Sequence, residues 1–388
     1  MKIGLVCPYN IVRSGGVQEQ VKAIRTELQK HGHRVKIITP EPRDISECDP
    51  TDILFIGNAT DFRSPLHTTV QVSASMNESI QRMLEEEKFD VLHFHEPWVP
   101  VLSRQILSRS NAVNIATFHA ALPSTRMSRT FIKVVTPYTR STLKYIDYFT
   151  AVSEVASEYI CSLTDEPVTI IPNGIDLGRF KAPQKYDEDK EKKTIFYVGR
   201  LENRKGVKHL LRAFRLLTDQ EPNVSLIIAG DGPYRYKLEM LAETLDLHNV
   251  TFTGYISDEE KIKYLQTSDL FCSPAVYGES FGIVLLEAMA MGLVTVAGNN
   301  PGYSAIMNGL GSVSIIDPKD SAEFARRLDL LLHEKQLRKI WRSWASEQLE
   351  QYNFPRVVAQ YEELYEDALR KRSRKQPSLG SVLSETGQ

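Results

Sequence analysis

The segment Tyr277–Glu287 combines two carboxylates with a glycine-flanked turn, in the order Tyr-Gly-Glu-Ser-Phe-Gly-Ile-Val-Leu-Leu-Glu. Glu279 lies in the turn, and Glu287 follows eight residues later inside an apolar run. If a helix begins near Ser280, its rise of about 1.5 Å per residue separates the two carboxylates by roughly 12 Å. That separation exceeds the ~5–9.5 Å between the paired carboxyl groups of glycoside hydrolases.

The helix expected after this turn would present free backbone N–H groups and a partial positive charge, which suit a phosphate. Ser280 and Gly282 are typical of a loop that leads into such a helix end. The segment therefore predicts an elongated ligand held at two ends with a phosphate between them, which is the shape of a sugar nucleotide. The alternative is that two glutamates simply share one helix.

The apolar run Phe281–Gly298 is nearly long enough to suggest a membrane-spanning helix. Glu287 inside it and Gly292 near its middle favour a different structure. We expect a buried helix followed by a buried strand, Leu293–Ala297.

A second glycine turn, Ser14-Gly15-Gly16-Val17, follows the first predicted strand and precedes a helix. Gly15 and Gly16 would let the backbone approach a phosphate closely. A nicotinamide dinucleotide site would instead need Gly-x-Gly-x-x-Gly with an acidic residue about twenty positions further on. The turn therefore predicts a phosphate contact without a dinucleotide cofactor, with an ordinary tight turn as the alternative.

Three cations cluster in the segment Gly199–Gly206, where a strand ends and a helix begins. Arg200, Arg204 and Lys205 could neutralise a diphosphate and the negative charge that develops on a leaving group. A solvated basic turn is the alternative. The position at the carboxyl end of a strand favours a ligand site.

His119 closes the apolar strand Asn114–Phe118. A lone histidine usually belongs to the core, but ligands of open α/β sheets bind at the carboxyl ends of strands, so we expect a functional role. His93 and His95 alternate along another strand without an obvious third metal ligand, although Glu96 is adjacent. We interpret these two histidines as structural or supporting.

The segment Pro97–Ile146 contains no Asp or Glu but carries several cations. Arg126, Arg129 and Lys133 fall on one face at helical spacing. A basic surface on a nearly neutral chain suggests an anionic acceptor or an anionic membrane. Chance clustering on a solvated face is the alternative.

Short apolar strands alternate with amphipathic helices in two successive halves, which predicts parallel sheets covered on both faces. The expected strands are Lys2–Cys7, Arg34–Thr39, Ile53–Gly57, Val91–His95, Asn114–Phe118, Tyr148–Val152, Thr194–Gly199, Val224–Gly230, Val250–Thr253, Leu270–Ser273 and Leu293–Ala297. The expected helices are Val17–Lys30, Ser75–Lys88, Trp98–Ser108 and Met127–Tyr145, with others that begin near Lys205, Tyr234, Asp258, Ser280 and Asp320. Two such halves predict two doubly wound α/β domains.

Shifts in composition predict the boundaries between domains. We expect an N-terminal domain over 1–177, a linker over 178–193, a C-terminal domain over 194–352 and a disordered tail over 371–388. The linker contains Asp187-Glu-Asp189, formally an Asp-x-Asp of the kind that binds a metal–diphosphate. No apolar strand leads into it, so we interpret this run as solvated charge.

The length of 388 residues favours two domains, and 42% apolar with 25% charged residues is typical of a soluble globular protein. The net charge of −2 indicates no nucleic-acid partner. Four widely spaced cysteines without a Cys-x-x-Cys argue against a disulfide framework or structural zinc, and fit a reducing compartment. The N-terminus lacks a secretory pattern and no segment looks membrane-spanning, so we expect a cytoplasmic protein whose membrane contact, if any, is peripheral on the cytoplasmic face.

In combination and order, these motifs resemble the family 4 glycosyltransferases of the GT-B fold over essentially the whole chain. The motifs that carry the resemblance are Gly15-Gly16-Val17, Thr117-Phe-His119, Ile171-Pro-Asn-Gly-Ile-Asp176, Gly199-Arg200, Arg204-Lys205-Gly206, Gly230-Asp-Gly-Pro233 and Glu279-x7-Glu287. Cys7-Pro-Tyr9, His95-Glu-Pro97 and Gly278–Val284 look most like the bacterial phosphatidylinositol mannosyltransferases. The resemblance implies two Rossmann-like doubly wound domains facing across a cleft, closure of the domains around the substrates, and a final helix over about 355–370 that completes the first domain.

The resemblance also implies the residues that would hold the donor. Arg200 and Lys205 would bind its diphosphate, Glu279 would hold hydroxyls of the transferred sugar, and Glu287 would hold the ribose. Further donor contacts would come from Gly15, Gly16, Arg204, Ser280, Phe281, Gly282 and Ile283, largely through backbone amides.

The remaining implied roles lie around the base, the reacting centre and the acceptor. Asp258 and Lys261 would lie near the base, with guanine as the candidate. His119 would contact the sugar near the reacting centre. Tyr9 would lie on the acceptor side, where we also place the basic residues Arg126, Arg129 and Lys133. The implied catalytic set is His119, Arg200, Lys205 and Glu279.

One segment departs from the mannosyltransferases, which carry a basic amphipathic helix that docks on anionic lipid. The corresponding segment here is Ser75–Lys88, with an apolar stripe of Met76, Ile80, Met83 and Leu84. Its opposite face is acidic, and an anionic surface repels such a face. A lipid acceptor then requires another contact, for which the segment Arg126–Lys144 is the candidate.

The sequence therefore predicts a retaining glycosyltransferase that moves a hexose, first of all mannose from GDP-mannose, to a phosphatidylinositol-type or other glycolipid acceptor. The resemblance implies that no divalent metal or other cofactor is needed and that no enzymic nucleophile is agreed for the family. Two alternatives stay open. One is a UDP-sugar-dependent transferase with a soluble or different lipid acceptor, and the other is a non-catalytic subunit that binds sugar nucleotides.

Overall fold

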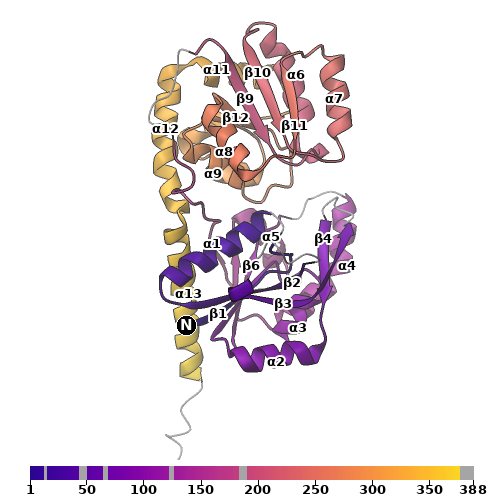
Figure 1. Cartoon of the computed structure of the whole chain (residues 1–388), viewed down its shortest axis with the longest axis vertical. Coiled ribbons are helices and arrows are strands. Elements are labelled where there is room, and N and C mark those ends of the chain that lie inside the picture. Colours follow the sequence, from indigo (N-terminus) through magenta and orange to yellow (C-terminus); the bar gives the residue numbers. More distant parts are fainter. Residues whose placement is uncertain (13–14, 43–49, 64–68, 122–125, 183–189, 376–388) are drawn as a thin grey trace, which may run out of the picture. The chain divides into compact units, whose positions relative to one another are not determined.

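The computed structural model describes residues 1–12, 15–42, 50–63, 69–121, 126–182 and 190–375. The chain forms two compact units: unit 1 is Met1–Gly174 with Phe354–Gln388, and unit 2 is Ile175–Asn353. Each unit is built on its own sheet with helices packed against it (Figure 1). Among the described residues, no helix is both long and apolar enough to cross a membrane.

Unit 1 contains an eight-stranded sheet in the order β4-β3-β2-β1-β5-β6-β7-β8. Its strands are β1 (Lys2–Val6), β2 (Arg34–Glu41), β3 (Ile53–Arg63), β4 (Thr69–Ala74), β5 (Val91–His95), β6 (Val113–Phe118), β7 (Tyr148–Ala151) and β8 (Val168–Ile170). All neighbouring strands are parallel except β3 and β4. The strand order reverses between β1 and β5, and open α/β sheets bind ligands at the carboxyl side of such a point.

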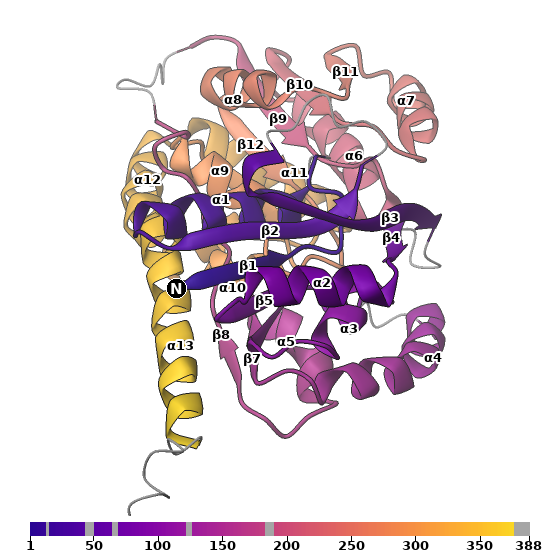
Figure 2. The same ribbon diagram turned by 60° about the horizontal axis from the view of Figure 1, so that its bottom comes forward.

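The helices of unit 1 cover this sheet and supply its core. They are α1 (Gly16–Lys30), α2 (Asn77–Glu87), α3 (Leu102–Leu107), α4 (Arg126–Leu143), α5 (Glu154–Cys161) and α13 (Phe354–Lys375). Val21 and Ile24 of α1 and Val358 and Tyr361 of α13 pack with Ile3 in one buried cluster. The last helix thus lies beside α1 and completes the core of unit 1 (Figure 2).

Unit 2 contains a six-stranded parallel sheet in the order β11-β10-β9-β12-β13-β14. Its strands are β9 (Lys193–Val198), β10 (Val224–Ala229), β11 (Val250–Gly254), β12 (Leu270–Ser273), β13 (Thr295–Gly298) and β14 (Ile315–Ile316). The order reverses between β9 and β12. The loops that leave the carboxyl ends of these two strands carry the predicted diphosphate cations and Glu279.

The helices of unit 2 are α6 (Val207–Thr218), α7 (Arg235–Thr244), α8 (Asp258–Thr267), α9 (Ile283–Ala290), α10 (Pro301–Ile306), α11 (Ser321–His333) and α12 (Lys335–Leu349). Their apolar residues recur at helical spacing, so each helix buries one face. In α6, for example, Leu210, Phe214 and Leu217 are buried while Lys208 is not. Only α9 is apolar almost all round, and it is buried accordingly.

The predicted α/β class with two parallel-sheet halves is confirmed, but several details are wrong. Strand β4 was missed, and it runs antiparallel because only five residues separate it from β3, too few for a crossover helix. The helix expected near Ser280 begins at Ile283, since the backbone at Gly282 has a φ of +117° and cannot be helical. The pattern also missed the short elements β8, β14, α5 and α10, and the helix α12.

The predicted boundaries also differ from the structure. Helix α13 begins at Phe354 and ends at Lys375, so the prediction of a disordered tail is wrong for residues 371–375. Asp367 pairs with Arg370 and Lys371 at 3.0 and 2.6 Å, which supports the last turns of the helix. The rest of the tail and residues 183–189 of the predicted linker, including its Asp-x-Asp, lie outside the described residues.

The predicted apolar stripe of the Ser75–Lys88 helix is only partly correct. Ile80 and Met83 are buried, but Met76 is 72% exposed and precedes the first helical residue of α2. Helix α3 is also shorter than predicted, because Pro97 and Pro100 lie before its first turn.

Candidate functional site

Two loops of unit 2 leave the carboxyl ends of the neighbouring strands β9 and β12 and meet at Gly206. This glycine has a φ of +74°, and a Cβ atom there would lie 1.9 Å from the carbonyl oxygen of Pro274. The Val276 N–H donates to the Arg204 carbonyl at 2.8 Å just beside this contact. The close approach of the two backbones brings the cations of the first loop to the carboxylate of the second.

Glu279 is held by two cations on the same oxygen. Arg204 Nη1 lies 2.6 Å and Lys205 Nζ 2.8 Å from Glu279 Oε1. Burial alone would raise the pKa of Glu279, but Lys205 and Arg204 outweigh burial and lower it. The carboxylate is therefore ionised and fixed through Oε1.

Arg204 is engaged mainly with protein groups. Its Nε lies 2.8 Å from Glu202 Oε2, and its Nη1 also donates to the Gly278 carbonyl at 3.1 Å. Glu202 is 7% exposed in its side chain and also pairs with Arg200, which is 54% exposed, at 3.2 Å. The predicted diphosphate cations thus separate into a brace, Arg204, and groups that can face a ligand, Arg200 and Lys205.

Glu279 leads into α9 through a tightly packed loop. A Cβ atom at Gly302 would lie 2.3 Å from the Glu279 carbonyl oxygen, and one at Gly282 would lie 2.8 Å from the Tyr303 ring. Gly282 caps α9 without a side-chain hydrogen bond. Phe281 is buried against Tyr352, so its side chain anchors the loop and only its backbone can serve a ligand.

A second ionic cluster lies around Glu287 in α9. Lys261 Nζ lies 2.8 Å from Glu287 Oε1 and 3.4 Å from Asp258 Oδ1, and Arg179 lies 2.8 Å from Asp258 Oδ2. Burial raises the pKa of Glu287, although Lys261 acts in the opposite direction. Within the described part of the chain, Glu287 Oε2 is buried without a hydrogen-bond partner. Two carboxylates are therefore each fixed through one oxygen by cations: Glu279 in the loop before α9, and Glu287 within α9.

In unit 1, three buried histidines form a group: His93 and His95 lie on β5, and His119 follows β6. His95 Nδ1 lies 2.9 Å from His119 Nε2, and His93 bonds to Tyr365 of α13 at 2.7 Å and to Thr117 at 2.6 Å. Burial lowers the pKa of His93 to about 3 and that of His119 to about 4. These imidazoles are neutral at ordinary pH, and His119 is engaged by His95 rather than isolated.

Glu96 holds the backbone of His119 and was noted from the sequence only as a neighbour of the strand histidines. Its carboxylate accepts the backbone N–H groups of His119 and Ala120 and the indole N–H of Trp98. Burial raises the pKa of Glu96 to about 7 in spite of these three donors.

The other predicted residues of unit 1 lie on separate elements. Gly15 and Gly16 form the first turn of α1, with Gly15 in an extended conformation as its cap. Tyr9 follows β1, and burial raises the pKa of its hydroxyl. Lys133 is exposed on α4. The side chains of Arg126 and Arg129 lie outside the described residues.

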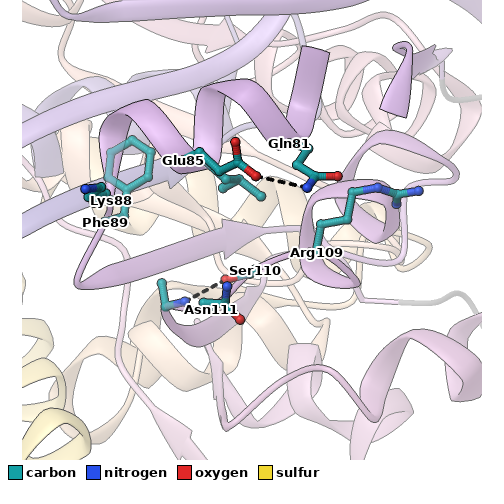
Figure 3. Close-up of a pocket in the computed structure, with 9 residues that line it drawn as sticks. Gln81, Glu85, Lys88, Phe89, Arg109, Ser110 and Asn111 are labelled. Atoms are coloured by element: carbon teal, nitrogen blue, oxygen red, sulfur yellow. Dashed lines mark hydrogen bonds between the residues drawn. The ribbon is translucent and has the colours of Figure 1, made fainter. Parts of the chain in front are cut away.

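A groove of about 580 Å³ lies at the opposite, amino edge of this sheet, between α2 and the turn before β6 (Figure 3). Gln81 and Glu85 of α2 face it and bond to each other at 2.9 Å, and Arg109 and Asn111 line its other side. None of the predicted site residues lines this groove, and nothing in its lining identifies a ligand.

Sequence reasoning missed the supporting residues Glu202, Arg179, Tyr303 and Glu96. Glu202 lies two residues from each of two arginines, and that spacing could have identified it. Arg179 and Tyr303 come from distant segments, so only the folded chain shows their contacts with Asp258 and Gly282.

Comparison with known proteins adds evidence about the family. Residues 14–179 match the family model described as Glycosyltransferase Family 4, and residues 178–348 match the model described as Glycosyl transferases group 1. The chain is 30% identical over 372 residues to phosphatidyl-myo-inositol mannosyltransferase of Mycolicibacterium smegmatis, covering 94% of each chain.

Solved structures show the same fold at lower identity. Sucrose-phosphate synthase from Thermosynechococcus elongatus has a TM-score of 0.77 at 19% identity, over 95% of this chain and 99% of that one. The Anabaena protein HepE, solved in complex with UDP-glucose, has a TM-score of 0.74 at 16% identity, over 95% and 100%. These likenesses show the predicted two-domain GT-B fold.

We predict that Gly206→Ala lowers the Tm of unit 2 by at least about 5 °C, since it combines a strained positive φ with a backbone clash. Gly32→Ala is the matched control, because Gly32 has a φ of +84° but nothing within 4 Å of the added Cβ. Differential scanning calorimetry of both variants tests this. Equal losses of Tm would show that the close approach of the two loops is not a constraint.

We predict that Lys261→Met destabilises the protein by about 3–5 kcal/mol near pH 8, because it leaves Glu287 buried and unpaired. The raised pKa of Glu287 rises further, so the penalty grows with pH above the unfolded carboxyl pKa of about 4.3 and fades toward it. Denaturant unfolding at pH 5 and pH 8 measures the difference. Lys263→Met, an exposed change on the same helix, is the control, and a pH-independent penalty would contradict the pairing.

Proposed function

The chain belongs to the glycosyltransferases of group 1 and family 4, and we propose that it is a retaining transferase that moves a hexose from a nucleotide sugar to a glycolipid. The first candidate is transfer of mannose from GDP-mannose to a phosphatidylinositol-type acceptor. The observation that carries the proposal is the Glu279 carboxylate, fixed through Oε1 by Arg204 and Lys205 directly before α9.

The donor's sugar and diphosphate would bind around this carboxylate. Oε2 of Glu279 would accept hydroxyl groups of the hexose while Oε1 stays on its cations. Lys205 and the exposed Arg200 would neutralise the diphosphate, together with backbone amides of 280–283 at the start of α9. These groups would also stabilise the negative charge that develops on the leaving phosphate.

The nucleoside would bind around the second ionic cluster. The free, buried Oε2 of Glu287 is a hydrogen-bond acceptor that a ribose hydroxyl would satisfy, and an unsatisfied buried acceptor is otherwise costly. Asp258 and Lys261 would face the base. Asp258 is now paired with Arg179 and Lys261, so it would recognise a base with its remaining acceptor capacity.

In unit 1, the neutral His119 group and Tyr9 would serve the reacting centre and the acceptor side, and the exposed Lys133 on α4 would favour an anionic acceptor. We propose that the departing phosphate accepts the proton of the acceptor hydroxyl. The cations Arg200 and Lys205 would replace a divalent metal in this step.

Two similar proteins favour different donors. The similar mycobacterial protein is named for phosphatidyl-myo-inositol and mannose, which favours GDP-mannose. HepE is bound to UDP-glucose, which favours the second candidate, a UDP-sugar-dependent transferase.

We predict that GDP raises the Tm of the protein strongly, whereas UDP and ADP raise it by a small fraction of that amount. A ligand at about 100 times its Kd stabilises by roughly 2.7 kcal/mol, so the cognate base is readily distinguished. A larger shift with UDP would favour the second candidate. No shift with any of the three would contradict a nucleotide-sugar site.

We predict that Glu279→Ala lowers kcat for hexose transfer by at least about 10²–10³-fold, because it removes the carboxylate that aligns the sugar. Mass spectrometry of products from labelled GDP-mannose and mixed lipids measures transfer. Glu347→Ala, an exposed change on α12, is the control and keeps wild-type turnover. Wild-type turnover in Glu279→Ala would refute the role of this residue. Donor hydrolysis by the wild type without acceptor distinguishes an enzyme from a silent binding subunit.

We predict that transfer is insensitive to EDTA, because the two cations supply the charge that a metal would otherwise supply. The rate is measured in metal-depleted buffer before and after excess Mg²⁺ or Mn²⁺. Loss of transfer with EDTA and its recovery with either metal would contradict a metal-independent mechanism.

A further inference from the structure

Glu96 occupies an unusual place at the carboxyl ends of β5 and β6 in unit 1. Its backbone N–H still donates to the Thr117 carbonyl at 2.9 Å, so it extends the pairing of these strands by one bond. Its φ is then +52°, a left-handed conformation that residues other than glycine seldom adopt. At this strained turn the side chain reaches the backbone of the first two residues after β6.

The carboxylate binds three N–H donors from two loops. Oε1 accepts from the consecutive amides of His119 and Ala120, and Oε2 accepts from the indole of Trp98. The residue is 1% exposed. A strained backbone and a buried charge are both costly, so the surrounding structure must hold this arrangement in place.

The two amides determine the direction of the turn that carries His119. In a trans peptide the N–H and C=O groups point in opposite directions. Two amides pinned on one oxygen therefore also fix the carbonyl of His119, which points away from Glu96. The ring of the same residue is held by His95 at 2.9 Å.

No other described residue makes an ion pair with Glu96, and the nearby imidazoles His95 and His119 are neutral. The three donors demand an acceptor at both oxygens, so glutamine, a neutral amide of the same shape, cannot replace the carboxylate without loss.

We propose that Glu96 is a positioning residue for hexose transfer, which aligns the His119–Ala120 turn by accepting both of its amides and the Trp98 indole. This inference rests on the proposed function. Glu96 is too deeply buried to touch substrate and acts through His119, which the family resemblance assigns to the reacting centre.

The test compares Glu96→Gln, Trp98→Phe and the double variant. In Glu96→Gln one oxygen can still accept the two amides, but its NH₂ group then faces the Trp98 N–H, donor against donor. We expect kcat to fall about 10–100-fold because a misplacement of about 1 Å can cost that much. The donor Kd, measured by calorimetry with GDP or the cognate nucleotide, stays within about twofold because none of the contacts proposed for the nucleotide involves Glu96 or the His119–Ala120 turn.

Trp98→Phe removes the opposing donor while keeping a ring. Alone it lowers kcat by no more than about threefold, and combined with Glu96→Gln it restores kcat at least about threefold over the single variant. A role in folding alone would move the Tm and the active fraction but would not produce this rescue. If Glu96→Gln does not fold, Glu96→Asp replaces it, and we expect the same loss of kcat at unchanged donor Kd.

The outcomes separate the two claims. Wild-type kcat in folded Glu96→Gln, or a double variant no better than the single one, overturns the role of Glu96 while leaving the transferase intact. Absence of transfer by the wild-type protein with every nucleotide sugar overturns the proposed function itself.

Discussion

The proposed donor site depends on one physical constraint: a buried carboxylate, Glu279, must keep its charge. Burial opposes ionisation, and the two cations in direct contact with Glu279 offset that cost. Arg204 and Lys205 do so from the end of β9, while Glu279 comes from the loop after β12. Because β9 and β12 are neighbours in a parallel sheet, their carboxyl ends bring these loops together. The order of the strands, the contact between the loops and the ion pairs thus all hold the Glu279 carboxylate beside Arg204 and Lys205.

The need to keep Glu279 charged also explains why glycines line these loops and why Glu202 lies beside Arg204. The loops can approach closely enough only where no Cβ intervenes, as at Gly206 and Gly302. Arg204 is shared between two carboxylates, since its Nε pairs with Glu202 while its Nη1 pairs with Glu279. Lys205 and Arg200 are then the cations that we propose for the diphosphate. The buried histidines of unit 1 are neutral and bond to one another and to hydroxyl groups, whereas the buried Glu279 of unit 2 is held by ion pairs.

Much of this could be predicted from the sequence because it depends on local patterns. Alternating strands and helices predict the α/β class, and cations or carboxylates directly after strands lie at one edge of a parallel sheet. What escaped prediction depends on contacts between distant segments. The brace formed by Arg204 is one case, since the sequence does not distinguish it from its neighbours Arg200 and Lys205. The extension of α13 past residue 370 is another, because a basic run is typical of a tail until Asp367 pairs with it. Glu96 was also underestimated, since its role depends on two amides of the next strand's loop.

The most direct test is a crystal structure of the protein with an intact sugar nucleotide or its non-hydrolysable analogue. The account predicts diphosphate oxygens within hydrogen-bond distance of Lys205 Nζ and the Arg200 guanidinium, and a hexose hydroxyl on Glu279 Oε2. A nucleotide that binds elsewhere, or a diphosphate that touches neither cation, would contradict it.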